Sequence, residues 1–389
     1  MRTDADKLVF LGRLAAGVAV IVAGAWIVGL VQLLASPEYG GEALDVDFSA
    51  YWAAAKLTIS EGPLVPFDME RLNAARGLPP DIETAPMLWL YPPGWLVVIL
   101  PFGYLSFFWG WLIFSLISLL IFAAVLSMPC RDLPGSRLLI LASPVALLVL
   151  ALGQNSLLFL SLLIAAIEAM RREKWVLAGL AIAIMTLKPQ LGLAIPVALA
   201  FGGYWRVIFW ATLGTVVIVA LSLLWPGLEY WPAFFEGVSK GSDVMRDSYL
   251  PSIMASAYGT AVVLGIGQDL ALLLQVGFSL VVAAALGWIW YARVSFDLKA
   301  AGLAFSVLLI TPYAIYYELI FVLVGFLYLA RAVGMARRGT AFLGVIVWAL
   351  PVLALVLLKD GPGFAFAAPL VLVAFGTVLW QAKRAEAFA

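Results

Sequence analysis

The chain has 389 residues, of which 64% are hydrophobic and only 12% are charged. A water-soluble domain carries roughly 25% charged residues, so this composition predicts a protein whose surface faces lipid. The formal net charge is zero, with 23 basic and 23 acidic residues, which gives no case for a nucleic-acid partner. Histidine is absent and Cys130 is the single cysteine, which excludes Ser-His-Asp catalysis, an internal disulfide and a cysteine-based zinc site.

The apolar runs predict an all-α polytopic membrane protein with about 12 transmembrane helices. They lie at 8–34, 106–127, 138–152, 155–170, 175–187, 190–202, 207–225, 269–292, 300–313, 316–330, 341–358 and 364–380. Several runs are shorter than the roughly 20 residues that cross a bilayer upright. We therefore expect pairs of short runs to meet at polar breaks and to enclose a cavity, because irregular backbone at that depth must be covered by protein or water.

We predict one membrane domain over 1–389, with a first extracytoplasmic loop at 35–92 and a second large extracytoplasmic segment at 226–268. The first is predicted to hold a helix from Phe48 to Ser60, and the second an interfacial helix near 252–264. Residues 93–105 fit a short dip from the outer face, broken at Pro101, and whether this segment crosses or re-enters the membrane stays open. The aromatic residues of 225–249 either stack on a sugar or form an interfacial belt; they are Trp225, Tyr230, Trp231, Phe234, Phe235 and Tyr249.

Basic residues set the predicted orientation. With both termini in the cytoplasm, 16 of the 23 Lys and Arg residues fall on the inner side and 7 on the outer side, as the positive-inside rule requires. Under this topology, six polar breaks fall on the outer side: 45–47, 91–93, 153–155, 188–190, 313–318 and 359–360. Ionisable residues at membrane depth mark functional sites by default. We therefore expect Asp47, Tyr91, Gln154, Lys188 and Glu318 to converge on one cavity.

Apart from Tyr91, these residues also have purely structural interpretations. Asp47 precedes a predicted helix and is equally suited to be its N-cap or a catalytic base. Lys188 is either a snorkelling lysine at the interface or a cation that receives a lipid phosphate. Gln154 and Asn155 are typical turn residues, and Glu318 is favoured at a helix N-terminus by the helix dipole.

Five stretches, taken in order, resemble the membrane glycosyltransferases of family 87. That family is a bacterial group of polyprenyl-phosphate-sugar-dependent enzymes with the GT-C fold and includes mannosyltransferases. The stretches are Asp47-Phe48-Ser49-Ala50-Tyr51-Trp52, Tyr91-Pro92-Pro93, Gly153-Gln154-Asn155, Leu187-Lys188-Pro189-Gln190, and Thr311-Pro312-Tyr313 with Tyr317-Glu318-Leu319. The resemblance implies a GT-C-like bundle in the bacterial inner membrane, with its active site facing the periplasm or exterior.

The resemblance also implies a reaction: a hexose or pentose moves from a polyprenyl-phosphate sugar to a lipid or glycan acceptor. Asp47 matches the acidic residue of the first outer loop that serves as base, Asp45 is its reserve, and Lys188 would neutralise the departing lipid phosphate. The implied substrate-binding residues are Lys188, Gln154, Asn155, Tyr91, Tyr51, Tyr313, Tyr317, Glu318 and Gln190. Many members carry His or Asp where this chain has Tyr317 and Glu318, which leaves open the sugar or acceptor handled there.

The expected partners are the polyprenyl-phosphate sugar donor, the acceptor and membrane lipids, with no nucleic acid. No cofactor beyond the lipid-linked donor is expected and no metal ligands are assigned, although Asp45 and Asp47 leave a divalent ion open. Two alternatives to an enzyme are a transporter or flippase of polyprenyl-linked glycans and a non-catalytic assembly partner. A transporter is expected to place charges near the midplane of two related halves, whereas the polar breaks of this chain lie outward, which favours the enzyme.

Overall fold

The computed structural model of the chain describes residues 46–77, 87–246, 250–334 and 367–387, with isolated positions at 6–24 and 344–349. Within these ranges the chain is helical, with one isolated β-bridge between Met254 and Ile315 and no β-strand. The all-α prediction is confirmed. Apart from the isolated positions, the predicted runs at 8–34 and 341–358 lie outside the described residues, as do Asp45, Tyr249 and the break at 359–360.

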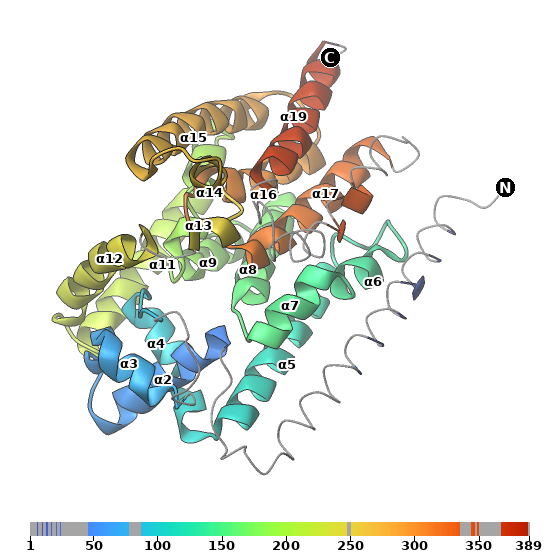
Figure 1. Ribbon diagram of the computed structural model, residues 1–389. Helices are drawn as coiled ribbons and strands as arrows, with labels where there is room; N and C mark the ends of the chain where they lie inside the picture. Colours follow the sequence, from blue (N-terminus) through green and yellow to red (C-terminus); the bar gives the residue numbers. More distant parts are fainter. Residues whose placement is uncertain are drawn as a thin grey trace.

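Figure 1 shows how the described helices are arranged. The first half of the chain forms α2 (Asp47–Ser60), η1 (Val65–Phe67), α3 (Met69–Ala75), α4 (Pro93–Ile99), η2 (Leu100–Tyr104), α5 (Phe107–Leu126), α6 (Ser136–Leu141), α7 (Pro144–Leu152), α8 (Ser156–Arg171) and α9 (Trp175–Met185). The second half forms η3 (Pro189–Leu191), α10 (Ile195–Phe201), α11 (Trp205–Leu224), α12 (Tyr230–Arg246), α13 (Leu250–Ile253), α14 (Ala257–Val263), α15 (Gln268–Tyr291), α16 (Phe296–Ile310), η4 (Tyr316–Leu319), α17 (Ile320–Val333) and α19 (Ala367–Glu386).

Among the described residues, four helices are long and apolar enough to cross a membrane: α5, α11, α15 and the continuous stretch of η4 and α17 over Tyr316–Val333. Other predicted runs form shorter apolar helices, such as α9 and α10, as their lengths indicated. The predicted helix at 48–60 is present as α2, and 93–105 forms α4 and η2 with the change of helix type at Leu100, next to Pro101. The total of about 12 spans and the course of 93–105 relative to the bilayer stay predictions.

The structure corrects two predicted elements. The run 138–152 is not one helix but two, α6 and α7, separated at Ser143. The Ser143 hydroxyl accepts a hydrogen bond from the backbone N–H of Ala146 at 3.3 Å and caps α7, and Pro144 is the first residue of α7. Because proline disfavours helical backbone in the residue before it, the helix breaks there. The predicted interfacial helix near 252–264 is likewise divided into α13 and α14, and the long helix α12 was not predicted.

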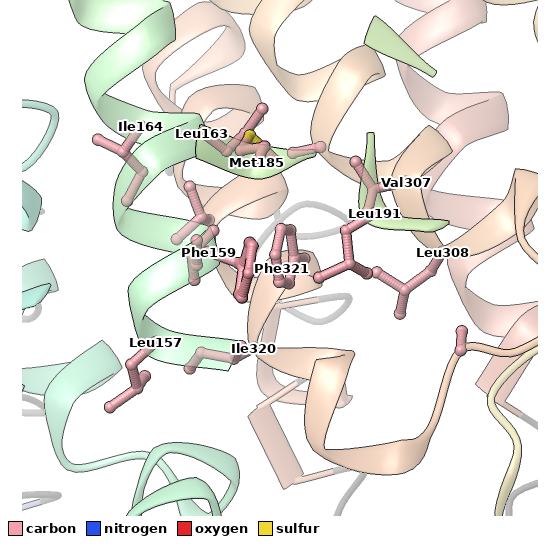
Figure 2. Packing of buried hydrophobic residues seen from close by; sticks show 14 of the residues in the cluster. Leu157, Phe159, Leu163, Ile164, Met185, Leu191, Val307, Leu308, Ile320 and Phe321 are labelled. Carbon is pink, nitrogen blue, oxygen red and sulfur yellow. The ribbon is translucent and has the colours of Figure 1, made fainter. Parts of the chain in front are cut away.

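The core lies where α8, α9, α16 and α17 meet (Figure 2). Lipid is as apolar as leucine, so close packing, assisted by small residues, holds such helices together. A Cβ on Gly325 of α17 would lie 2.7 Å from the Phe305 ring of α16, and a Cβ on Gly179 of α9 would lie 2.8 Å from the Ala211 backbone nitrogen of α11. The two glycines therefore allow helix pairs to approach more closely than any larger residue would permit.

The C-terminal end of α8 carries an ionic cluster that joins three helices and a loop. Arg171 pairs with Asp297 of α16 and with Glu168 at 3.4 Å. Arg331 of α17 reaches Asp297 at 3.1 Å and Asp132 of the α5–α6 loop at 3.2 Å. The cluster thereby ties the C-terminal ends of α8 and α17 together, and the opposite ends of both helices begin at predicted polar breaks.

Candidate active site

The predicted polar breaks within the described residues converge on one cavity of about 290 Å³. Its walls come from α2, the extended segment 87–91, the α7–α8 turn, the α9–η3 turn, α13 and residues 313–318. The lining residues are Val46, Asp47, Ala50, Tyr51, Met87, Leu88, Leu90, Tyr91, Leu152, Gln154, Lys188, Gln190, Leu250, Ile253, Tyr313, Ile315, Tyr316, Tyr317 and Glu318. The expected meeting of Asp47, Tyr91, Gln154, Lys188 and Glu318 is confirmed as geometry, and their roles stay predictions.

Asp47 is the first residue of α2 and lines the cavity. The N-cap position belongs to Val46, whose own side chain makes no capping hydrogen bond. The interpretation of Asp47 as the N-cap is therefore wrong, although a carboxylate in the first turn is still favoured by the helix dipole. Asp47 is half-buried, and its place in the first turn of α2 puts it in the cavity lining.

Gly153 places Gln154 against α2. It ends α7 with a φ of 62°, a conformation that costs glycine little and other residues more. A Cβ at this position would lie 2.6 Å from the Phe48 Cβ and 2.8 Å from the Trp111 ring, so the close approach of α2 also requires glycine. The turn therefore brings Gln154 within reach of the next helical turn of α2, where Tyr51 lies.

Hydroxyl and amide groups form a continuous network behind the cavity surface. The Tyr51 hydroxyl donates to Gln154 Oε1 at 2.9 Å and lies 2.7 Å from the Tyr91 hydroxyl. Asn155 Nδ2 donates to the Tyr91 hydroxyl at 3.3 Å, and the Asn155 side chain is fully buried. Gln154 and Asn155 thus form the turn, as their residue types indicated, and also orient two phenols that line the cavity.

Lys188 extends this network to an ion pair. Its Nζ lies 2.8 Å from Glu318 Oε1 and donates to Asn155 Oδ1 at 3.0 Å. The side chains of Lys188 and Glu318 are only 3% and 1% exposed, so the interpretation of Lys188 as a snorkelling lysine is wrong. Pro189 begins η3 directly after Lys188 and interrupts the apolar run between α9 and α10, which turns the lysine inward.

Glu318 has a structural and a site role at once. Its Oε2 accepts the backbone N–H of Ile315 at 3.1 Å, which caps η4, while its Oε1 pairs with Lys188. Glu318 therefore lies at the helix N-terminus, where the helix dipole was expected to favour it. The second oxygen of the same carboxylate pairs with Lys188, which lines the cavity.

The cavity wall at 87–91 rests on Asn73, which sequence reasoning missed, and on Tyr230, which was expected to stack on a sugar or to form an interfacial belt. The side-chain amide of Asn73 in α3 donates to the Met87 carbonyl at 2.9 Å and accepts the Met87 N–H at 2.9 Å. It therefore pairs with the Met87 backbone in the way that a neighbouring β-strand would. Tyr230 of α12 accepts from Trp89 Nε1 at 2.6 Å and donates to the Tyr91 carbonyl at 3.2 Å. The amide of Asn73, which lies in the short helix α3, carried no sequence signal for this contact.

The aromatic lining differs from one expectation. None of Trp225, Tyr230, Trp231, Phe234 and Phe235 lines the cavity; its aromatic surface comes from Tyr51, Tyr91, Tyr313, Tyr316 and Tyr317. Tyr316 is an addition to the predicted site, whereas Asn155 lies behind the surface and holds lining residues in place. Within the described ranges, no three His, Cys, Asp or Glu side chains gather as metal ligands do.

The fold and the cavity together define a helical membrane protein with a buried ion pair and a carboxylate at one tyrosine-lined site. Residues 89–312, more than half of the chain, match the model of glycosyltransferase family 87, and the chain belongs to this family. It is therefore a membrane glycosyltransferase. Comparison with curated proteins and with solved structures found no match. Asp47 and Glu318 lie outside the matched residues, and the folded chain brings both to the cavity that the matched residues line.

Proposed function

We propose that the protein transfers a hexose or pentose from a polyprenyl-phosphate sugar to a lipid or glycan acceptor, with Asp47 as general base. The observation that carries the proposal is the shared cavity, in which the Asp47 carboxylate and the Lys188 ammonium line the same space. The proposed setting is a GT-C-like bundle in the bacterial inner membrane, with the cavity at its outer face and both termini in the cytoplasm. No observation on the described residues favours the flippase alternative.

The proposed reaction is a displacement at the anomeric carbon. The acceptor hydroxyl oxygen forms the new bond to that carbon, and the bond between the carbon and the phosphate oxygen breaks. The hydroxyl proton passes to Asp47, and the bonding electron pair leaves with the polyprenyl phosphate. General base catalysis of this kind contributes about 10²- to 10⁴-fold to the rate.

Lys188 is arranged to receive the charge that develops on the phosphate. An ammonium has three N–H donors, and two of them face Asn155 and Glu318. We assign the third to a phosphate oxygen in the cavity that Lys188 lines. A donor fixed before the reaction stabilises the leaving group without reorganising. The phenols of Tyr51 and Tyr91 supply hydroxyls and ring faces suited to a sugar.

The test of the base uses purified protein, polyprenyl-phosphate sugars and a panel of lipid and glycan acceptors. We expect Asp47→Asn to lower the transfer rate by about 10²-fold or more, because the amide cannot take the proton. Glu70→Gln is the matched control, since Glu70 is also an acidic residue in the first turn of an outer helix, α3, and is exposed away from the cavity. Transfer by Asp47→Asn at the rate of Glu70→Gln would remove Asp47 from the mechanism.

The test of the donor site compares Lys188→Met/Glu318→Gln with the unaltered protein. The double variant removes both charges, so it avoids the buried unpaired glutamate that Lys188→Ala alone would leave. We expect a higher KM for the lipid-linked donor and an unchanged KM for the acceptor. An equal change in both values would contradict the phosphate role.

A further inference from the structure

A second hollow lies between α15 and α19, far along the chain from the active site. It has a volume of about 510 Å³ and is lined by Ala285, Trp288, Gly376, Leu379, Trp380 and Lys383. We call this hollow the α15–α19 groove. α19 packs mainly along α16, and α15, α16 and α19 are grouped on one side of the molecule (Figure 1).

The walls of the groove are apolar and its end is basic. Lys383 is its single charged lining residue among those described, and the Arg384 guanidinium lies 4.9 Å from the centre of the Trp380 ring. Trp288 lies near the end of α15, a helix long enough to cross the membrane. Tryptophan beside lysine and arginine at the end of a span is typical of the depth of lipid headgroups. The one acidic residue nearby on α19, Glu386, is exposed and does not line the groove.

We propose that the α15–α19 groove binds one anionic phospholipid, with an acyl chain against Leu379 and the two tryptophans and with the phosphate at Lys383. The charge pattern selects this occupant: an apolar slot that opens at a basic end complements a molecule with an apolar chain and a negative head. A zwitterionic lipid fills the same slot but gains less from the lysine. The proposal does not depend on sugar transfer, so its failure leaves the proposed reaction untouched.

Gly376 lines the groove, and replacing it with a larger residue provides a variant in which the groove is filled. A Cβ at this position would meet nothing within 4 Å, so a side chain can begin here in open space. Gly277 of α15 is equally open and lies outside the groove lining. Gly376→Leu therefore fills the groove, and Gly277→Leu makes the same change on the exposed surface of a neighbouring helix.

The experiment measures lipid retention by native mass spectrometry of the full chain in detergent. Phosphatidylglycerol and phosphatidylcholine with identical acyl chains are supplied in equal amounts. We expect the unaltered protein and Gly277→Leu to retain phosphatidylglycerol preferentially, and Gly376→Leu to lose the bound lipid. Lys383→Gln is expected to reduce the preference for phosphatidylglycerol by about fivefold, the effect of one basic side chain near an anionic lipid. Lys174→Gln, an exposed lysine outside the groove lining, is its matched control.

Each other outcome overturns the proposal. Equal retention by Gly376→Leu and Gly277→Leu would show that lipid binds elsewhere. Equal retention of the two phospholipids by the unaltered protein would remove the role of Lys383. If light scattering shows a dimer that Gly376→Leu dissociates, the occupant is a second copy of the chain. A melting temperature for Gly376→Leu equal to that of Gly277→Leu confirms that loss of lipid does not reflect unfolding.

Discussion

Single and joint replacement of Lys188 and Glu318 measures how far the ion pair holds the candidate active site together. The two side chains meet at 2.8 Å and are 3% and 1% exposed, so either charge left alone would be buried without its counter-ion. Removing one partner of a buried pair costs about 3–5 kcal/mol. Lys188 would retain Asn155, and Glu318 would retain the Ile315 N–H, so we place each single loss near the lower end.

The joint variant separates coupling from simple loss of contacts. Lys188→Met and Glu318→Gln are expected to lose about 3 kcal/mol each, which would total about 6 kcal/mol if the sites were independent. Replacing both charges leaves no unpaired ion, and the side-chain amide introduced by Glu318→Gln still offers an oxygen to the Ile315 N–H. We therefore expect the joint variant to lose about 2 kcal/mol or less.

The assay is reversible unfolding of the four proteins in the same detergent, with thermal melting as a second measurement. We expect the free energy of unfolding to be highest for the unaltered protein, lower for the joint variant and lowest for the two single variants. Losses that simply add would refute the reasoning, because they would show that neither charge depends on the other.

Two further predictions concern packing and accessibility. Gly179→Val is expected to destabilise the protein by about 1–3 kcal/mol through overpacking, because its Cβ would strike the backbone of Ala211; Gly277→Val, at an open position, should melt near the unaltered protein. Cys130 is buried, and burial raises the pKa of its thiol to about 11. Maleimide labelling of the folded protein should therefore be slow at pH 7 and rise about tenfold per pH unit below that pKa, since the thiolate is the reactive form; rapid labelling at pH 7, followed by mass, would contradict this. Because the thiol reacts slowly wherever it lies, labelling of Cys130 in intact cells does not report on which side of the membrane it lies. Cysteines introduced at the exposed positions Lys174 and Glu229 in a Cys130→Ala background report the orientation directly.

Much of the site was predictable because a polar break in an apolar chain is a local signal. Proline after Lys188 and glycine before Gln154 interrupt helices whatever the rest of the chain does. The pairing of the breaks was not predictable, since Lys188 and Glu318 are 130 positions apart (318 minus 188) and nothing local indicates that they meet.

The missed elements have physical reasons of their own. The break at Ser143 did carry a signal, a capping serine before proline, but it lay inside a run that hydropathy alone joined together. The helix α12 buries Tyr230, Phe234 and Gly241, with half-buried Gly237 on the same face. Two of these four positions are glycines, whose closeness to Phe67 and Leu90 matters more than their hydropathy. Because two of the four positions on the packed face are glycines, only the other two contribute to the apolar pattern by which a helix is predicted from sequence.

The distance along the chain between Lys188 and Glu318 also bears on how the protein is made. Synthesis proceeds at about 5–20 residues per second, so 130 residues take roughly 6–26 s. During that interval Lys188 has emerged and its carboxylate partner does not yet exist, while Asn155 is already present to accept one of its hydrogen bonds. The ion pair of the candidate active site therefore cannot form until the start of η4 has been made, long after the helices on either side of Lys188.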